Sequence, residues 1–250
     1  MKKIYNFIHC ATLALLSVTF TQCDNFLDTI DRTEKNDQNF PLNEKDTQQA
    51  LAGCYQVLAA NHRYAFQPPC EFSDEMFANG SGTSPEAVYG ENLNDYTTEM
   101  FSNRVYRCNS LLEAIDGITF ETETAKKKVL GETYFVRAMC YFDLTRMYGD
   151  VPLYQTSEVS NIPRNPATEV FALIASDMKK AIELLPSTPF ENMLKSEMGH
   201  ASKWAAESMM ARIFLFYTGY YKSETLPLIE GGSLSKEDVI GYLNNCIQSS

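Results

Sequence analysis

The chain has 250 residues, enough for one large domain or two small ones, and its 44% hydrophobic and 21% charged residues are typical of a folded globular protein rather than a disordered one. The formal net charge of −11 argues against nucleic acid as a partner, because contact with a phosphate backbone needs clustered Lys and Arg.

Residues 1–22 have the pattern of a secretory signal peptide. Two lysines precede a mostly apolar stretch at residues 4–20, which is too short and wrongly flanked for a stable membrane span. Cys23 then stands at the expected cleavage point, in VTFTQCDNFLD, where bacterial lipoproteins carry an acylated cysteine. Gln22 departs from the small residue that is usual before that cysteine, so an ordinary signal peptide cleaved elsewhere, or an uncleaved anchor, stays open as an alternative.

Acylation of Cys23 would decide how the mature protein is held at the membrane. Two or three acyl chains anchor a protein durably, whereas a single chain does not. No later stretch approaches the run of about 18 apolar residues that reads as a spanning helix. We therefore expect a protein that is tethered by lipid and does not cross the membrane.

The first helical pattern follows a polar, turn-rich tether at residues 24–43. Asn43 is a suitable N-cap for residues 44–62, in which apolar side chains recur with helical spacing. These side chains are Leu51, Cys54, Tyr55 and Leu58. Residues 62–92 then lose this periodicity and are rich in Pro, Gly, Ser and Asn, which predicts a long loop. Such loops are usually functional or disordered, and the aromatic side chains here argue against plain disorder.

Two helices are predicted next. Residues 93–118 carry an apolar stripe and stop at Asp116 and Gly117, and residues 124–148 stop at Gly149. The charged residues between positions 131 and 148 are only Glu132, Arg137, Asp143 and Arg146. A surface helix would show one apolar stripe and one polar face. We therefore expect helix 124–148 to be an inner helix, covered on several sides by other helices.

The rest of the chain repeats the order of an apolar helix and an amphipathic helix. Residues 167–185 are amphipathic, residues 199–221 are again apolar almost all round, and residues 236–250 begin after the N-cap Ser235. The buried stripe expected on the last helix consists of Val239, Leu243, Cys246 and Ile247. No strand is predicted. The fold class is therefore all-α, built from irregular tetratricopeptide-like helix pairs with long inserted loops.

The cysteines do not form a disulfide framework. Cys10 leaves with the signal peptide, Cys23 is the proposed acylation site, and five cysteines remain, an odd number without regular spacing. These five are Cys54, Cys70, Cys108, Cys140 and Cys246. All except Cys70 sit in helical apolar patterns, where a free thiol behaves as a small buried hydrophobe.

The stretch LGETYFVRAMCYFDLTRMYGDVPLY closely resembles the signature of the SusD/RagB-type lipoproteins. The matching positions are Gly131, Glu132, Phe135, Arg137, Ala138, Tyr141, Phe142, Leu144, Tyr148, Gly149, Val151, Pro152 and Leu153. Three more pieces agree in chain order: CDNFLD, FSNRVYRCNSLLEAID and GHASKWAAESMMARIFLF. The second has Phe101 where Trp is common, and the third departs from the family pattern at His200, Ser202, Trp204 and Met210.

This resemblance implies a lipid-anchored outer-membrane protein on the cell surface. Members of the family bind oligosaccharide nutrients and cover a SusC-like TonB-dependent transporter as a lid. The family is not enzymatic, and no cofactor or metal is expected. Residues 23–250 would be its N-terminal helical region, since family members usually run to about twice this length. We accordingly expect the chain to be an N-terminal part of a longer protein, because the last helical stripe also lacks a partner helix.

The family's ligand site draws in part on the segment after its first helix, here residues 62–100. Sugar binding needs flat aromatic faces for the apolar side of the ring and polar side chains for the hydroxyls. The candidate ligand-binding residues are therefore Tyr64, Phe66, Asp74, Tyr89, Asn92, Asn94 and Tyr96. Any one of the aromatic residues taken alone is more often a residue that packs the loop against the protein, so the prediction rests on the set.

The two other classes of function for this sequence are a glycosidase and a helical scaffold for protein partners. A glycosidase would use paired carboxylates, but Asp74 and Glu75 are sequence neighbours and cannot face each other across a substrate. No nucleotide-binding, zinc or nucleophile motif occurs, and His62 and His200 are isolated, so we expect no enzymatic activity. A helical scaffold that docks the transporter or other proteins without a ligand of its own stays open.

Overall fold

All the α-helices in the described part of the chain coincide with stretches that the sequence predicts as helical. The computed structural model describes residues 40–60, 105–158 and 160–248, which lie in the compact unit Pro41–Ser250 apart from Phe40. The helices are α2 (Glu44–Ala60), α5 (Tyr106–Ala114), α6 (Glu123–Tyr148), α7 (Ala167–Leu184), α8 (Lys203–Tyr221) and α9 (Lys236–Gln248). The expected all-α fold is confirmed. Residues 1–22 and Cys23 lie outside the described residues.

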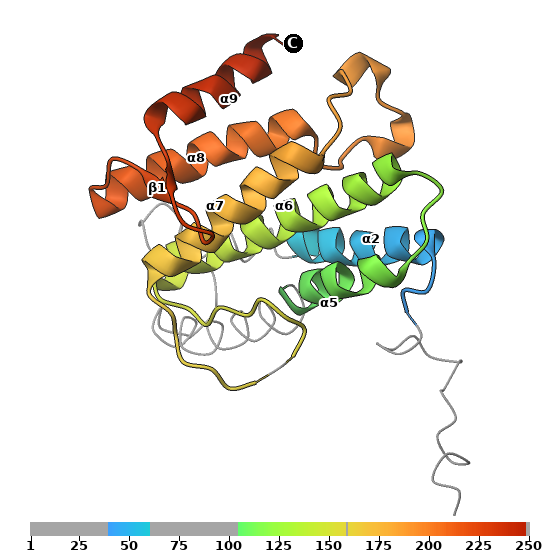
Figure 1. The fold of residues 1–250 in the computed structure, drawn as a ribbon, viewed down its shortest axis with the longest axis horizontal. Helices are drawn as coiled ribbons and strands as arrows, with labels where there is room; N and C mark the ends of the chain where they lie inside the picture. The colour runs from blue at the N-terminus through green and yellow to red at the C-terminus, as the bar shows by residue number, and fades with distance from the viewer. Residues whose placement is uncertain (1–39, 61–104, 159, 249–250) are drawn as a thin grey trace, which may run out of the picture. The chain divides into compact units, whose positions relative to one another are not determined.

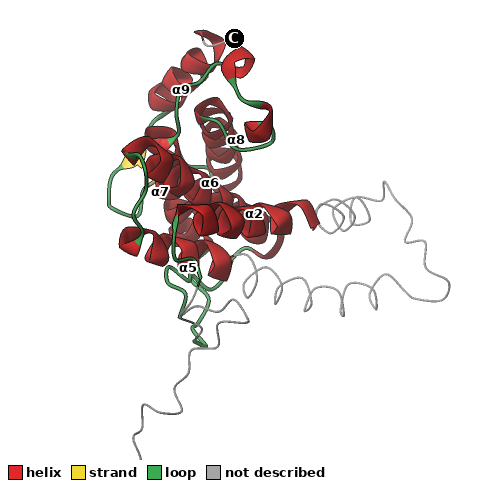
Figure 2. Ribbon diagram, turned by 90° about the vertical axis from the view of Figure 1, so that its right-hand side faces the viewer, coloured by secondary structure: helices red, strands yellow, loops and turns green. Residues whose placement is uncertain are grey.

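The helices pack as a stack in chain order. Helix α6 packs on α7, α7 on α8 and α8 on α9, while α2 and α5 cover another side of α6. Figures 1 and 2 show this order, from α2 and α5 at one side of the unit to α9 at the other. The predicted pairing of helix 124–148 with helix 167–185, and of helix 199–221 with helix 236–250, is therefore correct.

Helix α6 is the inner helix that its sequence predicts. Gly131 allows the close approach of α7, because a Cβ atom at this position would lie 2.9 Å from Leu185 Cγ. The helix begins at Thr122, whose side chain accepts a hydrogen bond from the Ala125 N–H at 3.1 Å. It ends at Gly149, where a φ of 69° stops the helix.

The predicted N-caps are also confirmed. The Asn43 side chain accepts a hydrogen bond from the Asp46 N–H at 3.0 Å, and the Ser235 hydroxyl accepts one from the Asp238 N–H at 3.2 Å. Each bond satisfies a backbone donor that the first turn of a helix leaves without an intrahelical partner. These two helix starts are therefore determined by local sequence.

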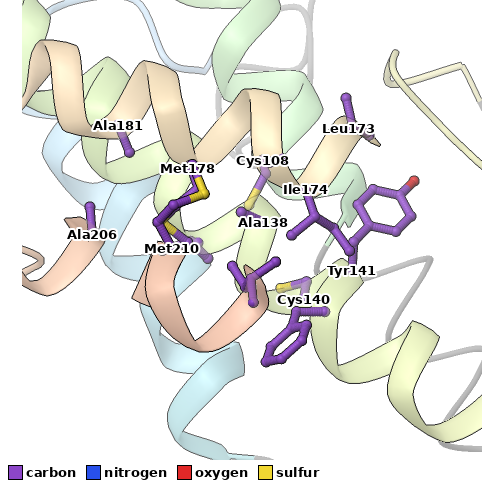
Figure 3. Close-up of a cluster of buried hydrophobic side chains, with 14 of the residues drawn as sticks. Cys108, Ala138, Cys140, Tyr141, Leu173, Ile174, Met178, Ala181, Ala206 and Met210 are labelled. Carbon is purple, nitrogen blue, oxygen red and sulfur yellow. The ribbon is translucent and has the colours of Figure 1, made fainter. Parts of the chain in front are cut away.

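A central part of the core lies between four helices (Figure 3). Its labelled side chains come from α5 (Cys108), α6 (Ala138, Cys140, Tyr141), α7 (Leu173, Ile174, Met178, Ala181) and α8 (Ala206, Met210). Burial of a large apolar side chain contributes about 1.5–3 kcal/mol each. Cys54, Cys108 and Cys140 are buried and belong to no disulfide, as the apolar patterns around them predict. Cys70 lies outside the described residues.

The last two helices are less buried than the sequence predicts. On α9 only Val239 of the expected stripe is buried, whereas Leu243 is 39% and Ile247 70% exposed. On α8, Leu215 and Tyr220 are 69% and 70% exposed. The predicted burial of Leu243 and Ile247 is wrong, because α9 packs mainly against α8 and these two side chains lie on its exposed side.

A short hairpin between α8 and α9 was not predicted. Strand β1 (Leu226–Pro227) pairs antiparallel with β2 (Ser233–Leu234), with Leu226 opposite Leu234. Both leucines are buried, and the hairpin packs on α7. Two-residue strands are too short to show the alternation that identifies a strand in a sequence. Within the described residues, no helix combines the length and the apolarity that a membrane crossing requires.

Candidate functional site

The long connection between α6 and α7, residues 149–166, is fixed at both of its ends. The Asn165 N–H donates to the Val151 carbonyl at 3.0 Å, and the Leu153 N–H donates to Asn165 Oδ1 at 3.2 Å. The Ala167 N–H donates to Asp150 Oδ1 at 2.8 Å. This last bond places a carboxylate at the N-terminus of α7, where the helix dipole favours negative charge.

The middle of this connection is held by Tyr141 from α6. Its hydroxyl donates to the Tyr154 carbonyl at 2.9 Å and accepts from the Tyr154 N–H at 2.7 Å. In Figure 3 this hydroxyl points away from the labelled apolar side chains. Burial raises the pKa of Tyr141, so the phenol stays protonated and can donate.

A buried side chain of α5 holds the same segment from a second direction. The Asn109 amide donates to the Tyr154 carbonyl at 3.0 Å and to the Thr156 carbonyl at 2.7 Å. The amide oxygen of Asn109 accepts in turn from Arg137 Nη1 at 2.7 Å. One amide therefore couples α5, α6 and the connection, and its donors and acceptor are all used.

Arg137 and Asp177 complete this buried network. The guanidinium makes two parallel hydrogen bonds to the carboxylate, from Nε to Oδ2 at 2.7 Å and from Nη2 to Oδ1 at 2.8 Å. Both side chains are almost completely buried. Burial raises the pKa of Asp177, against the lowering influence of the Arg137 charge and its hydrogen bonds. A bidentate pair is the arrangement that best offsets the desolvation of two buried charges.

A second network joins α2, α6 and the segment before α8. Glu132 is 1% exposed, and its Oε2 accepts from the Tyr55 hydroxyl at 2.8 Å and lies 2.6 Å from His200 Nδ1. The Tyr55 hydroxyl also accepts from the Ala201 N–H at 2.8 Å. Burial and the charge of Glu132 raise the pKa of Tyr55. His200, which the sequence left isolated, is thus part of a buried polar cluster.

The predicted ligand-binding residues all lie outside the described residues, and nothing in the structure tests them. They are Tyr64, Phe66, Asp74, Tyr89, Asn92, Asn94 and Tyr96. The described helices on either side of their segment, α2 and α5, pack together. Arg107 Nη1 donates to the Gly53 carbonyl at 3.1 Å. Both ends of the candidate segment are therefore attached to adjacent helices, and α5 carries the Asn109 that holds residues 154–156.

The polar network was missed by reading the sequence alone. A usable indication was present, because Glu132 and Arg137 stand in a helix that is otherwise apolar nearly all round. Charged residues in such a position must be paired when they are buried. Their partners Tyr55 and Asp177 are far away in sequence, and no local spacing connects them.

The two buried networks hold α2, α5, α6, α7 and the connection between α6 and α7 in fixed positions. The carboxylates of Glu132 and Asp177 are engaged by protein groups. Among the residues that the structure describes, no group of three or more His, Cys, Asp or Glu could hold a metal ion. Contacts from Asn109, Tyr141 and Asn165 hold the described residues of the connection, 149–158 and 160–166, and a rigid framework of this kind is what a loop-built ligand site requires.

Comparison with known proteins is consistent with this scaffold. A SusD-like family model, described as starch-binding and associating with the outer membrane, matches residues 25–215. A SusD-like protein of Formosa agariphila is 26% identical over 234 residues, which are 85% of this chain and 43% of that protein. A SusD-like protein of Bacteroides ovatus is 27% identical over 228 residues, 86% of this chain and 40% of that protein.

The fold agrees as well. The crystal structure of a SusD homolog from Bacteroides thetaiotaomicron superposes with a TM-score of 0.64 at 17% sequence identity, covering 87% of this chain and 43% of that one. The chain thus spans about two fifths of the length of the curated relatives described above. Since the family model covers most of its residues, this chain belongs to the SusD-like family.

Proposed function

We propose that the protein is a surface-exposed lipoprotein that binds oligosaccharide nutrients and delivers them to a SusC-like TonB-dependent transporter in the outer membrane. The observation that carries this proposal is the match of a starch-binding, outer-membrane-associated family over residues 25–215. A solved relative with a TM-score of 0.58 at 20% identity is described as laminarin binding, which adds a second glucan to the ligands worth testing.

The anchor in this proposal is Cys23, after removal of residues 1–22 as a signal peptide. An acylated N-terminus followed by a polar tether would leave the helical unit free to lie over a membrane partner. The helical region of residues 23–250 would then supply the scaffold.

The ligand in this proposal is bound by residues of the segment after α2. Tyr64, Phe66, Tyr89 and Tyr96 would offer aromatic faces, and Asp74, Asn92 and Asn94 would hydrogen-bond hydroxyl groups. No residue of the chain is assigned a catalytic role, and the protein is proposed to release its ligand unchanged.

Affinity electrophoresis of the full chain in gels that contain amylopectin, laminarin or other soluble polysaccharides tests this function. We expect at least one polysaccharide to retard the wild-type chain, and Tyr64→Ala together with Tyr96→Ala to remove most of the retardation. Leu194→Ala is the control, because this exposed side chain lies in the segment before α8. A chain that no polysaccharide retards, or one that hydrolyses the polysaccharide, would contradict the proposal.

A second candidate function is a helical scaffold that docks the transporter without binding sugar itself. The exposure of Ile240, Leu243 and Ile247 on α9 favours it, since apolar side chains gathered on one helix often mark a protein contact. Pull-down with the transporter separates the two functions. Retention of the chain by transporter in the absence of sugar, together with no retardation in any polysaccharide gel, would select the scaffold.

A further inference from the structure

Three aromatic rings from α7 and α8 form a nearly parallel stack that ends in solvent. Phe171 and Phe216 have ring centroids 5.9 Å apart and an interplanar angle of 20°. Phe216 and Tyr220 are 5.7 Å apart at 6°. We call Phe171, Phe216 and Tyr220 the ring stack. Phe171 is fully buried, Phe216 is half-buried and Tyr220 is 70% exposed, so the stack runs from the core to the surface.

Other aromatic rings hold the ring stack in place. Phe142 of α6 meets Phe216 at 5.7 Å and 90°, and Phe171 at 6.2 Å and 77°. Tyr221 meets Tyr220 edge to face at 4.9 Å and 73°. These are the favourable geometries for aromatic pairs. The exposed Tyr220 ring therefore lies parallel to Phe216 and edge to face with Tyr221. We call Tyr220 and Tyr221 the aromatic corner. Contacts with the neighbouring rings determine the orientation of the Tyr220 ring.

Charged groups lie beside the rings that support the ring stack. The Arg146 guanidinium lies 4.7 Å from the Phe142 centroid and donates to Asp143 at 2.6 Å. Burial first, and then the neighbouring Tyr220 and Asp150, raise the pKa of Tyr221, so this phenol stays protonated. Lys222, which follows at the end of α8, is exposed and has a left-handed backbone with a φ of 55°.

We propose that Tyr220, supported by Phe216 and Tyr221, is a stacking subsite for a pyranose ring of a neutral oligosaccharide. This inference rests on the proposed function and adds a sugar contact on α8 to the candidate residues after α2. A pyranose has an apolar face of C–H groups and a rim of hydroxyls. The Tyr220 ring offers the flat surface, and the exposed Lys222, two residues further along the chain, offers a donor for hydroxyls.

The size of the exposed surface favours sugar over protein. A stable protein–protein contact buries about 800 Å² on each partner, whereas here one exposed ring is flanked by two half-buried ones. The rigidity of the rings also favours binding. Because the neighbouring rings already hold the Tyr220 side chain, little side-chain entropy is lost when a flat ligand lies on it.

The test compares three variants of the full chain: Tyr220→Ala, Tyr220→Phe and Leu215→Ala. Leu215 is the matched control, because it lies on the same helix and is equally exposed, at 69%, but does not belong to the ring stack. Affinity is measured by electrophoresis in the amylopectin and laminarin gels. We expect Tyr220→Ala to weaken the affinity about two- to tenfold, as for loss of one aromatic contact. Tyr220→Phe and Leu215→Ala should keep wild-type affinity, and all melting temperatures should stay close together.

The outcomes separate the subsite from the proposed function. Wild-type retardation that Tyr220→Ala leaves unchanged would overturn the subsite and leave the proposed function intact. A wild-type chain that no polysaccharide retards would overturn both. If sedimentation shows a concentration-dependent dimer that Tyr220→Ala abolishes, while sugar affinity stays the same, the corner is a contact between copies of the chain and the sugar subsite is wrong.

Discussion

Arg137 of α6 and Asp177 of α7 form a bidentate ion pair inside the helical stack, with N–O distances of 2.7 and 2.8 Å. Through Asn109 the same guanidinium is connected to the carbonyls of Tyr154 and Thr156. The pair therefore links the packing of two helices to the position of the connection between them.

Arg137→Leu should destabilise the protein by about 3–5 kcal/mol, because it leaves the Asp177 carboxylate buried without its partner. Replacing both residues, as Arg137→Met with Asp177→Leu, should restore much of this loss, since no buried charge remains. Urea unfolding measures both. Arg146→Leu is the control on the same helix, where loss of a more exposed pair with Asp143 should cost at most about 1 kcal/mol. A double variant no more stable than Arg137→Leu would contradict this account.

Gly131→Val should destabilise the protein by about 1–3 kcal/mol through overpacking. Its Cβ would lie 2.9 Å from Leu185 Cγ and 3.1 Å from Leu184 Cβ. Ala138→Leu, also at a fully buried position of α6, should act in the same direction. Thermal unfolding gives the change in stability, and sugar affinity per folded molecule should be nearly unchanged.

The control for Gly131→Val is Gly219→Ala in α8, where an added Cβ meets no atom within 4 Å. This change should raise the stability by about 0.5–1 kcal/mol, because glycine within a helix loses more backbone entropy than alanine. If instead sugar affinity fell sharply in Gly131→Val at an unaltered melting temperature, α6 would belong to the binding site.

Glu230→Gln should reduce the stability at neutral pH and have little effect in acid. The Ser176 hydroxyl donates to Glu230 Oε2 at 2.6 Å, and this bond, with Lys180 at 3.4 Å, holds the pKa of Glu230 below its usual value. A carboxyl whose pKa is lowered by folding stabilises the protein above its unfolded pKa and loses that contribution as the pH falls through its folded pKa.

Urea midpoints of wild type and Glu230→Gln, measured from neutral to acid pH, check this prediction. The two midpoints should differ at neutral pH and converge below the folded pKa of Glu230. Ser176→Ala removes the donor to Glu230 and should likewise flatten the dependence on pH. A difference between the two midpoints that grows as the pH falls would show that ionised Glu230 does not stabilise the folded protein.

Cys23→Ala should release the protein from the outer membrane while the helical unit stays folded. The reason is that acyl chains on Cys23 would be the membrane anchor, and the tether after it is polar. Fractionation of a Gram-negative host, with circular dichroism of the released protein, measures both effects. Cys246→Ala is the control, since this half-buried thiol lies in α9. If Cys23→Ala still fractionates with the outer membrane, the protein is not held by a lipid on this residue.

Much of the fold follows from local sequence. The caps Asn43 and Ser235, the stop at Gly149 and the all-round apolar character of α6 are properties of consecutive residues. Backbone hydrogen bonding and the 3.6-residue periodicity act over a few turns, so helices can be predicted from them without knowledge of the packing. The order of the helices in the stack follows the order of the chain, because consecutive elements usually lie next to each other in space.

The candidate site depends on contacts that no local pattern contains. Asp177 meets Arg137 across 40 positions, and His200 meets Glu132 across 68, so only helix packing brings them together. The hairpin at residues 226–234 is stabilised by its packing on α7 rather than by strand length.

The sequence by itself determined where the helices lie, several of their ends, their pairing and the resemblance to the SusD-like family. Tertiary structure decided which side chains of those helices reach solvent. Phe216 and Tyr220 occupy one apolar face of α8, where sequence predicts only burial. Because α7 and α6 contact the first ring and leave the second 70% exposed, the same helical periodicity yields a half-buried residue packed on the core and an exposed residue one turn apart.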